Sequence, residues 1–249
     1  MALALGFGLS TPRFTGEDFS VLFNGSNHKI DYTTNDLRAI LAEGEANFKA
    51  SGSVSVWARV ETTGANGQLF DFCVDENNRI QTQYKHQADG FTAIYKAGGT
   101  AKTATFNPSG TQEGDGNFHH IVQTWDGEDL KLYYDGALKT TTDMSGVTFA
   151  GDYSDAAGVE GVEIVSGVSF NDNADYLGYL DDLAVYSGVL DLSQVQTIYN
   201  SGKAGPIVKT NLVAFWRFNE GSGSTVTSEI GGYTGTLTGA TFNKINASQ

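Results

Sequence analysis

The sequence predicts an all-β protein built as one antiparallel two-sheet sandwich with one or two short helices. Its 249 residues are enough to bury a full core, and a single all-β domain can reach this size. The chain holds 31 glycines and only 3 prolines, a composition that favours many strands joined by tight turns. Short alternating runs separated by Asp-Gly and Asn-Gly dipeptides recur along it, which is the pattern of antiparallel hairpins.

The clearest hairpin runs from Phe118 to Gly136, with the sequence FHHIVQTWDGEDLKLYYDG. Its turn is Asp126-Gly127, where glycine tolerates the positive φ that a tight hairpin needs. Because successive side chains of a strand point to opposite faces, His119 and His120 should lie on different sides of the sheet. Neighbours so placed cannot chelate one metal ion together, which favours a structural role for both histidines.

Further strands and two helices are predicted around this hairpin. Asn35 can cap a helix from Asp36 to about Glu43, and Asp191 with Gln194 forms a capping-box pair at the start of a second helix. Residues 145–174 are rich in Gly, Asp and Ser with little period, so they are predicted to form the longest loop. The first helix should turn Leu37, Ile40 and Leu41 to the core, and strands are expected at Phe19–Phe23, Ser51–Val60, Gln68–Val74, Arg79–Lys85 and Phe91–Ala97.

Four stretches carry motifs that occur together in one known family. They are the central hairpin, SVLFNGSNHKIDY from Ser20 to Tyr32, SGSVSVWARV from Ser51 to Val60, and GYLDDLAVYSGVLDLSQVQTIYNSG from Gly178 to Gly202. Together they resemble the laminin-G-like, concanavalin A-like jelly-roll family, which implies that the sandwich is a jelly roll. The stretch from Leu212 to Phe242 is similar to the segment that usually opens such a domain, yet here it comes last.

This order suggests how the chain is divided. A segment of about thirty residues cannot bury a core alone, and the two ends of a domain often lie close together. We therefore expect residues 19–249 to form a single laminin-G-like domain, completed by strands from residues 212–242. Residues 1–18, with the apolar run ALALGFGL, are predicted to form an N-terminal arm that docks on its own sandwich or on a neighbouring subunit.

Composition and motifs exclude several function classes. A formal net charge of −14 argues against nucleic acid as a partner, and no apolar stretch is long enough to cross a bilayer. Cys73 lies in an apolar run and is predicted to be a buried, inert thiol. Glucanases of the resembling fold use an E-x-D-x-E strand, but Glu160 and Glu163 lack that spacing, so we predict no catalysis.

The resemblance also implies a calcium site. In the family and its glucanase relatives, the Asp that opens the D-x-V-x-I-Y strand shares an ion with carbonyls near the early F-D-G turn. Carried over, this implicates Asp181 with oxygens around Asn24 and Gly25. Asn24 stands where the family usually has Asp, so it brings no charge. The alternative is that Asp181 accepts backbone N–H bonds and holds no ion.

Glycan binding is the family's commonest task, and sheet-face residues are the candidates for it. Sugars stack on aromatic rings and bond to planar polar side chains. A face of Tyr, Gln and Arg would equally suit a protein partner, and each residue could simply cover a sheet. The candidates for either role, provided that their sheet face is concave and open, are Trp57, Arg59, Gln81, Gln83, Tyr84 and Tyr95.

These observations favour a non-catalytic binding and assembly module. The apolar arm, the absence of a recognisable signal peptide and the single sandwich together suggest a virion or particle-surface protein, as in many tailed phages that carry this fold. Such a protein would be made in the cytosol and would assemble with itself or with virion proteins through the arm. The first alternative is a soluble lectin-like glycan binder. The second is a divergent glycosidase that depends on Glu160 or Glu163.

Overall fold

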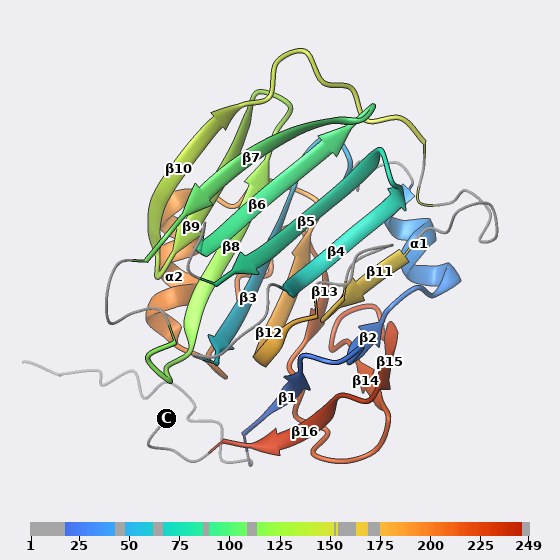
Figure 1. The fold of residues 1–249 in the computed structure, drawn as a ribbon, viewed down its shortest axis with the longest axis vertical. Coiled ribbons are helices and arrows are strands. Elements are labelled where there is room, and N and C mark those ends of the chain that lie inside the picture. Colours follow the sequence, from blue (N-terminus) through green and yellow to red (C-terminus); the bar gives the residue numbers. More distant parts are fainter. Residues whose placement is uncertain are drawn as a thin grey trace, which may run out of the picture.

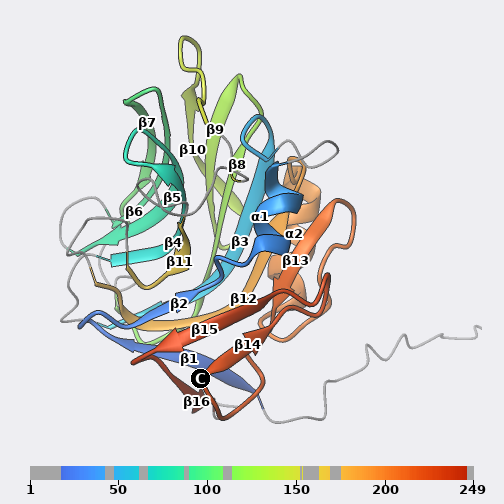
Figure 2. The same ribbon diagram turned by 90° about the vertical axis from the view of Figure 1, so that its right-hand side faces the viewer.

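The computed structural model confirms the predicted jelly-roll sandwich. It describes residues 18–42, 48–61, 67–86, 90–108, 114–151, 153, 163–168 and 175–245. Within these ranges two antiparallel eight-stranded sheets pack face to face, and two short helices flank them (Figures 1 and 2). Of the predicted arm, only Asp18 lies in the described part of the chain.

Sheet A has the strand order β10-β9-β8-β3-β12-β1-β16, and β13 also pairs with β12. The long strand β12 therefore offers one edge to β3 and shares its other edge between β1 and β13. Its strands are β1 (Phe19–Asn24), β3 (Gly52–Val60), β8 (His119–Trp125), β9 (Asp129–Tyr134), β10 (Ala137–Asp143), β12 (Leu177–Tyr186), β13 (Leu212–Trp216) and β16 (Thr241–Lys244).

Sheet B has the order β14-β15-β2-β11-β4-β5-β6-β7. In Figure 2 its strands β4 to β7 lie to the left of β8, β9 and β3 of sheet A. Its strands are β2 (Lys29–Asp31), β4 (Gly67–Asp75), β5 (Asn78–Lys85), β6 (Gly90–Ala97), β7 (Thr100–Phe106), β11 (Glu163–Ser166), β14 (Thr225–Thr227) and β15 (Thr234–Thr238).

The core lies between the two sheets and is formed by alternate residues of each strand. In β3 the alternation is regular, because Val54, Val56, Ala58 and Val60 join the core while the residues between them point outward. One polar pair crosses this core, where the Thr82 hydroxyl donates to Gln123 Oε1 at 2.6 Å. The pair satisfies two polar groups that would otherwise be costly to bury.

The C-terminal segment is built into both sheets. Strand β13 pairs with β12, β16 pairs with β1, and β15 pairs with β2. Figures 1 and 2 show β15 and β16, in red, beside the first strands β1 and β2, in blue. The two ends of the described chain therefore complete the same end of the sandwich.

At the side of the sandwich opposite the chain ends, the last strand of sheet A, β10, lies next to the last strand of sheet B, β7. Strands β7 and β10 each end their sheet on this side, and in the described part of the chain neither pairs with a further strand. Thr140 and Thr142 of β10 donate their hydroxyl protons to the carbonyls of Thr105 and Thr103 in β7, at 2.7 and 2.8 Å. These bonds occupy acceptors that an exposed edge would leave open to another chain.

The helices agree with the sequence in part. Helix α2 (Leu192–Ser201) begins with the predicted capping box of Asp191 and Gln194. Helix α1 (Asn35–Ala42) is capped by the Thr34 hydroxyl, which accepts from Leu37 N at 3.4 Å, and not by Asn35. The prediction for Ile40 is wrong: its side chain is 39% exposed, whereas Arg38 is buried and donates to the carbonyl of Tyr153 at 2.9 Å.

Strands β7 and β11 are among those that were not expected from the sequence. Apart from its last residue, Phe106, strand β7 is made of Thr, Ala and Lys, so it lacks the bulky alternation of a typical strand. Strand β11 lies inside the region predicted as the longest loop, where it bridges β2 and β4. Strand β7 forms a hairpin with the preceding strand β6. Strand β11 is held by β2 and β4, which are distant in sequence, and local patterns do not reveal such pairing.

Candidate functional site

Helix α2 covers one part of the outward face of sheet A. Its Val195 and Ile198 pack in a second apolar cluster with Val122, Tyr133 and other outward side chains of the sheet. Tyr199 lies parallel to Trp57, with ring centroids 6.0 Å apart and an interplanar angle of 18°. Trp57 is consequently only 7% exposed.

Next to this covered region, the same face carries a partly exposed row of side chains. The strand register places Leu22, Tyr179 and Arg59 side by side on β1, β12 and β3. Phe118 is the next residue in this row, and it immediately precedes the first residue of β8. We call these four residues the aromatic strip. Leu22, Phe118 and Tyr179 are all half-buried, so their side chains still reach solvent.

Two cations fix the rings of the aromatic strip. The Arg59 guanidinium lies over Tyr179, 3.8 Å from the ring centroid, and 5.6 Å from the centroid of Phe118. Lys203 Nζ lies 5.1 Å from the centroid of the same Phe118 ring. Cations over aromatic faces are attracted by the ring quadrupole, so the two rings are held in place before any ligand arrives.

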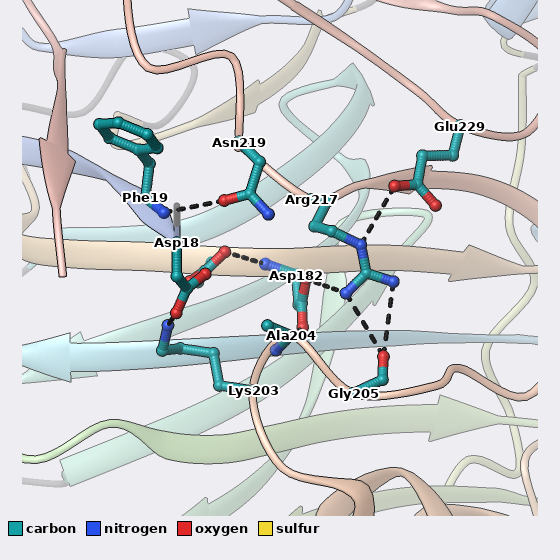
Figure 3. Close-up of polar contacts among 10 residues, drawn as sticks. Asp18, Phe19, Asp182, Lys203, Ala204, Gly205, Arg217, Asn219 and Glu229 are labelled. Carbon is teal, nitrogen blue, oxygen red and sulfur yellow. Dashed lines mark hydrogen bonds and ion pairs between the residues drawn. The ribbon is translucent and has the colours of Figure 1, made fainter. Parts of the chain in front are cut away.

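Lys203, which contacts the aromatic strip, also belongs to a group of largely buried charges, which Figure 3 shows. Its ammonium pairs with Asp18 and lies 3.0 Å from Asp181 Oδ2. Arg217 contacts Asp182 Oδ1 at 3.4 Å and Glu229 Oε1 at 3.1 Å, and it donates to the carbonyl of Gly205. We call Asp18, Asp181, Asp182, Lys203 and Arg217 the charge cluster.

The charge cluster forms where β12 leaves regular geometry. The pairing of β12 with β3 shifts register between Asp181 and Ala184, and Asp182 has a φ of 47°. This bulge lies at the point where the neighbour of β12 changes from β1 to β13. The Asp182 carboxylate then accepts from Ala204 N at 2.8 Å, so it also fixes the loop after α2.

Burial shapes the ionisation of the two central carboxyls. Burial, and next the adjacent Asp182 charge, raise the pKa of Asp181 well above its usual range, against the opposing effect of Lys203. Burial likewise raises the pKa of Asp182 to about 7, although Arg217 and the Ala204 N–H favour its charged form. Burying the carboxylates of the charge cluster therefore has a desolvation cost, and the cations and N–H donors around them offset this cost.

The two histidines of the central hairpin face opposite sides, as expected. His120 lies on the outward face of sheet A, where it is fully buried, and its Nε2 is 2.8 Å from the Ser55 hydroxyl. Burial lowers the pKa of His120 to about 3. His119 bridges two carboxylates, Asp135 at 2.8 Å and Asp115 at 3.3 Å. Burial alone would lower the pKa of His119, but hydrogen bonds and charges from these carboxylates outweigh it and raise the pKa.

This difference predicts an acid-dependent loss of stability. Because the folded-state pKa of His120 lies below the unfolded value of about 6.5, its contribution is complete above pH 6.5. It should be lost as pH falls toward 3, at up to about 1.4 kcal/mol per pH unit. Urea denaturation of the wild type and of His120→Gln between about pH 4 and about pH 7 measures this slope.

His119→Gln is the matched control for that slope. A raised pKa has the opposite sign, so His119 stabilises the fold most below pH 6.5 and its contribution is lost as pH rises through the folded-state pKa. The variant should therefore lose stability chiefly in acid relative to the wild type. Equal pH profiles for wild type and His120→Gln would contradict the assignment of a neutral buried imidazole.

The six residues predicted to bind a glycan or a partner do not meet on one surface. Trp57 and Arg59 lie on the outward face of sheet A. Gln81 and Gln83 are on β5 of sheet B, alternate with the core residue Tyr84, and are each 8% exposed. Tyr84 and Tyr95 belong to the core, at 1% and 4% exposure. Arg59 alone joins the partly exposed aromatic strip.

The three predicted calcium ligands also lie apart. Asn24 pairs with Leu177, whereas Asp181 is four residues further along β12, which corresponds to about 13 Å along a strand. Asp181 instead has the Lys203 ammonium beside it. Among the described residues no group of three His, Cys, Asp or Glu side chains is placed to hold a metal ion. The residues Asn24, Gly25 and Asp181 therefore do not fit one ion in this arrangement, and calcium binding stays a prediction.

Of the two glutamates of the glycosidase alternative, the structure describes only Glu163. Glu160 lies outside the described residues. Glu163 is on β11 opposite Cys73, and burial raises its pKa, with Lys29 the main opposing charge. Cys73 is buried, as predicted, and burial raises the pKa of its thiol. No described helix is long and apolar enough to cross a membrane.

Sequence reasoning did not find Phe118, Tyr179, Lys203 or Arg217. A signal was present for the first two, because Phe118 shares the outward parity of His120, and Tyr179 that of Asp181. Lys203 and Arg217 lie outside the regular strands and carried no pattern at all. Their positions follow from the path of the loops around β12.

Comparisons with known proteins agree with this architecture. A family model described as the concanavalin A-like lectin/glucanases superfamily, Laminin_G_3, matches residues 31–196. A search of curated proteins finds no significant match. Many solved structures are similar in fold.

Three of these structures illustrate the range. A Bacteroides ovatus protein assigned to carbohydrate binding has a TM-score of 0.63 at 14% identity, covering 93% of this chain and 61% of its own. Domain 4 of the Geobacillus stearothermophilus arabinanase AbnA, in complex with arabinotriose, has a TM-score of 0.53 at 18% identity, covering 72% and 76%. The Ruminococcus gnavus sialidase module CBM40, bound to α2,3-sialyllactose, has a TM-score of 0.52 at 14% identity, covering 72% and 96%. This chain thus spans less than two thirds of the first structure's length, and such low identities show the fold alone.

Proposed function

The chain belongs to the concanavalin A-like lectin/glucanases superfamily, and on that premise we propose that it is a non-catalytic carbohydrate-binding module. The aromatic strip is the observation that supports the proposal. Phe118 and Tyr179 offer half-buried rings on a sheet face, with centroids 6.4 Å apart and an interplanar angle of 64°. Rings that are held rigidly and still reach solvent suit the apolar faces of sugars.

Preorganisation strengthens this proposal. Arg59 and Lys203 contact the two rings and hold them in place, so little side-chain freedom remains to be lost when a ligand binds. Three structures of similar fold are described with carbohydrate binding, with arabinotriose and with α2,3-sialyllactose, which makes a glycan the first ligand class to test.

The assembly hypothesis depends on a different part of the chain. It requires the apolar arm of residues 1–18, nearly all of which lies outside the described residues. A virion role, protein partners and a particle-surface location therefore stay predictions, and the soluble glycan binder is the better supported reading.

A glycan array with the purified full chain tests the proposed function. We expect saturable binding to at least one oligosaccharide, and we expect Phe118→Ala and Tyr179→Ala each to weaken it about tenfold, since stacking on one aromatic ring contributes roughly 1 kcal/mol or more. Leu138→Ala is the matched control, because Leu138 is a 44% exposed apolar residue of the same sheet outside the strip. If both aromatic variants were folded, as verified by circular dichroism, and bound the glycan as tightly as the wild type, the aromatic strip would not be the binding site.

A further inference from the structure

Charged groups surround the aromatic strip, and each cation there already has a carboxylate partner. Arg59 pairs with Glu61 at 3.7 Å, and the Glu61 side chain is 44% exposed. Lys203 pairs with Asp18 and lies 3.0 Å from Asp181. The two cations that touch the rings are therefore neutralised from within the protein.

We infer that the aromatic strip selects neutral glycans and discriminates against glycans that carry carboxylates. This inference rests on the proposed function and names the ligand class of that same site. A sugar carboxylate would need a cation to offset its lost hydration, yet Arg59 and Lys203 could serve it only by giving up Glu61 or Asp18. A neutral pyranose or furanose needs only the ring faces and hydrogen bonds at the rim.

The wider field of the protein acts in the same direction. The chain carries a formal net charge of −14, which repels anionic polymers over the distance of a Debye length. Glu61 itself, as an exposed carboxylate beside the strip, would lie close to any acidic group on a bound sugar. Two independent features, the local pairing and the overall charge, thus disfavour the same class of ligand.

Paired glycan probes test the inference. We would measure binding of the full chain to lactose and α2,3-sialyllactose, and to galactotriose and trigalacturonic acid, by calorimetry at low and at physiological ionic strength. We expect the neutral member of a pair to bind at least about fivefold more tightly at low ionic strength, with the difference shrinking as salt screens the charges.

A charge-matched pair of variants locates the effect. Glu61→Gln releases Arg59 and should raise the ratio of acidic to neutral binding by about fivefold. Glu229→Gln removes the same charge from a similarly exposed partner of Arg217, away from the strip, and should leave the ratio unchanged. Equal shifts in both variants would assign the effect to net charge and overturn the role of the local pairing.

The outcomes separate the two proposals. Tighter binding of the acidic members by the wild type would overturn the selection of neutral glycans and leave the carbohydrate-binding function standing. Binding to none of these probes, and to nothing on the array, would overturn the proposed function and this inference with it. Preference for the neutral members that disappears in Phe118→Ala would support both.

Discussion

Replacing Arg217 by Met should destabilise the protein by about 3 kcal/mol or more, because the substitution leaves the buried Asp182 carboxylate without its cation. Asp182 is 4% exposed, and the Arg217 side chain is 13% exposed, so water cannot replace the lost partner fully. The guanidinium also donates to the carbonyl of Gly205, which would lose that bond. Urea denaturation at about pH 8, above the raised pKa of Asp182, measures the full effect.

Glu229→Gln separates the buried contact of Arg217 from its exposed one. Glu229 contacts the same guanidinium at 3.1 Å, but its side chain is 51% exposed. An exposed pair of this kind contributes about 0–1 kcal/mol. Suppose that Arg217→Met lowers the free energy of unfolding by no more than Glu229→Gln does. The charge cluster would then not be the contact that holds the loop after α2 and the segment after β13 to strand β12.

Much of the fold could be predicted because its signals are local. The outward and inward residues of β3, the split of His119 and His120, and the capping box of Asp191 each depend on positions a few residues apart. Strand β11 could not be found in this way. Its four residues are held by β2 and β4, and the paired residues of β4 lie 90 to 94 residues earlier in the chain. Nothing in the pattern of the four residues themselves requires a strand.

The candidate site was predicted less well, for two different reasons. Alternation shows which residues of a strand share a face, but it does not show which sheet the strand enters, so Arg59 and Gln81 were grouped although they lie on different sheets. A second error was avoidable, because Gln83 and Tyr84 are adjacent and cannot point to one face. Lys203 next to Asp181 had no local signal, since the loop after α2 brings it there.

Trp216→Ala tests whether the C-terminal segment is an integral part of this sandwich. Trp216 is fully buried on β13, its ring lies 4.5 Å from that of Tyr32, and its Nε1 donates to the carbonyl of Tyr233 at 3.0 Å. Its loss should cost about 3–5 kcal/mol, measured by urea denaturation, because it opens a cavity in the core. It also removes one of the two hydrogen bonds that the Tyr233 carbonyl accepts, while the bond from Ser228 N remains. Ile230→Ala, at a 36% exposed position of the same segment, should change stability by less than about 0.5 kcal/mol. If both variants behaved alike, residues 212–245 would be an appendage, and the pairing of β13 with β12 would not contribute to the stability of the domain.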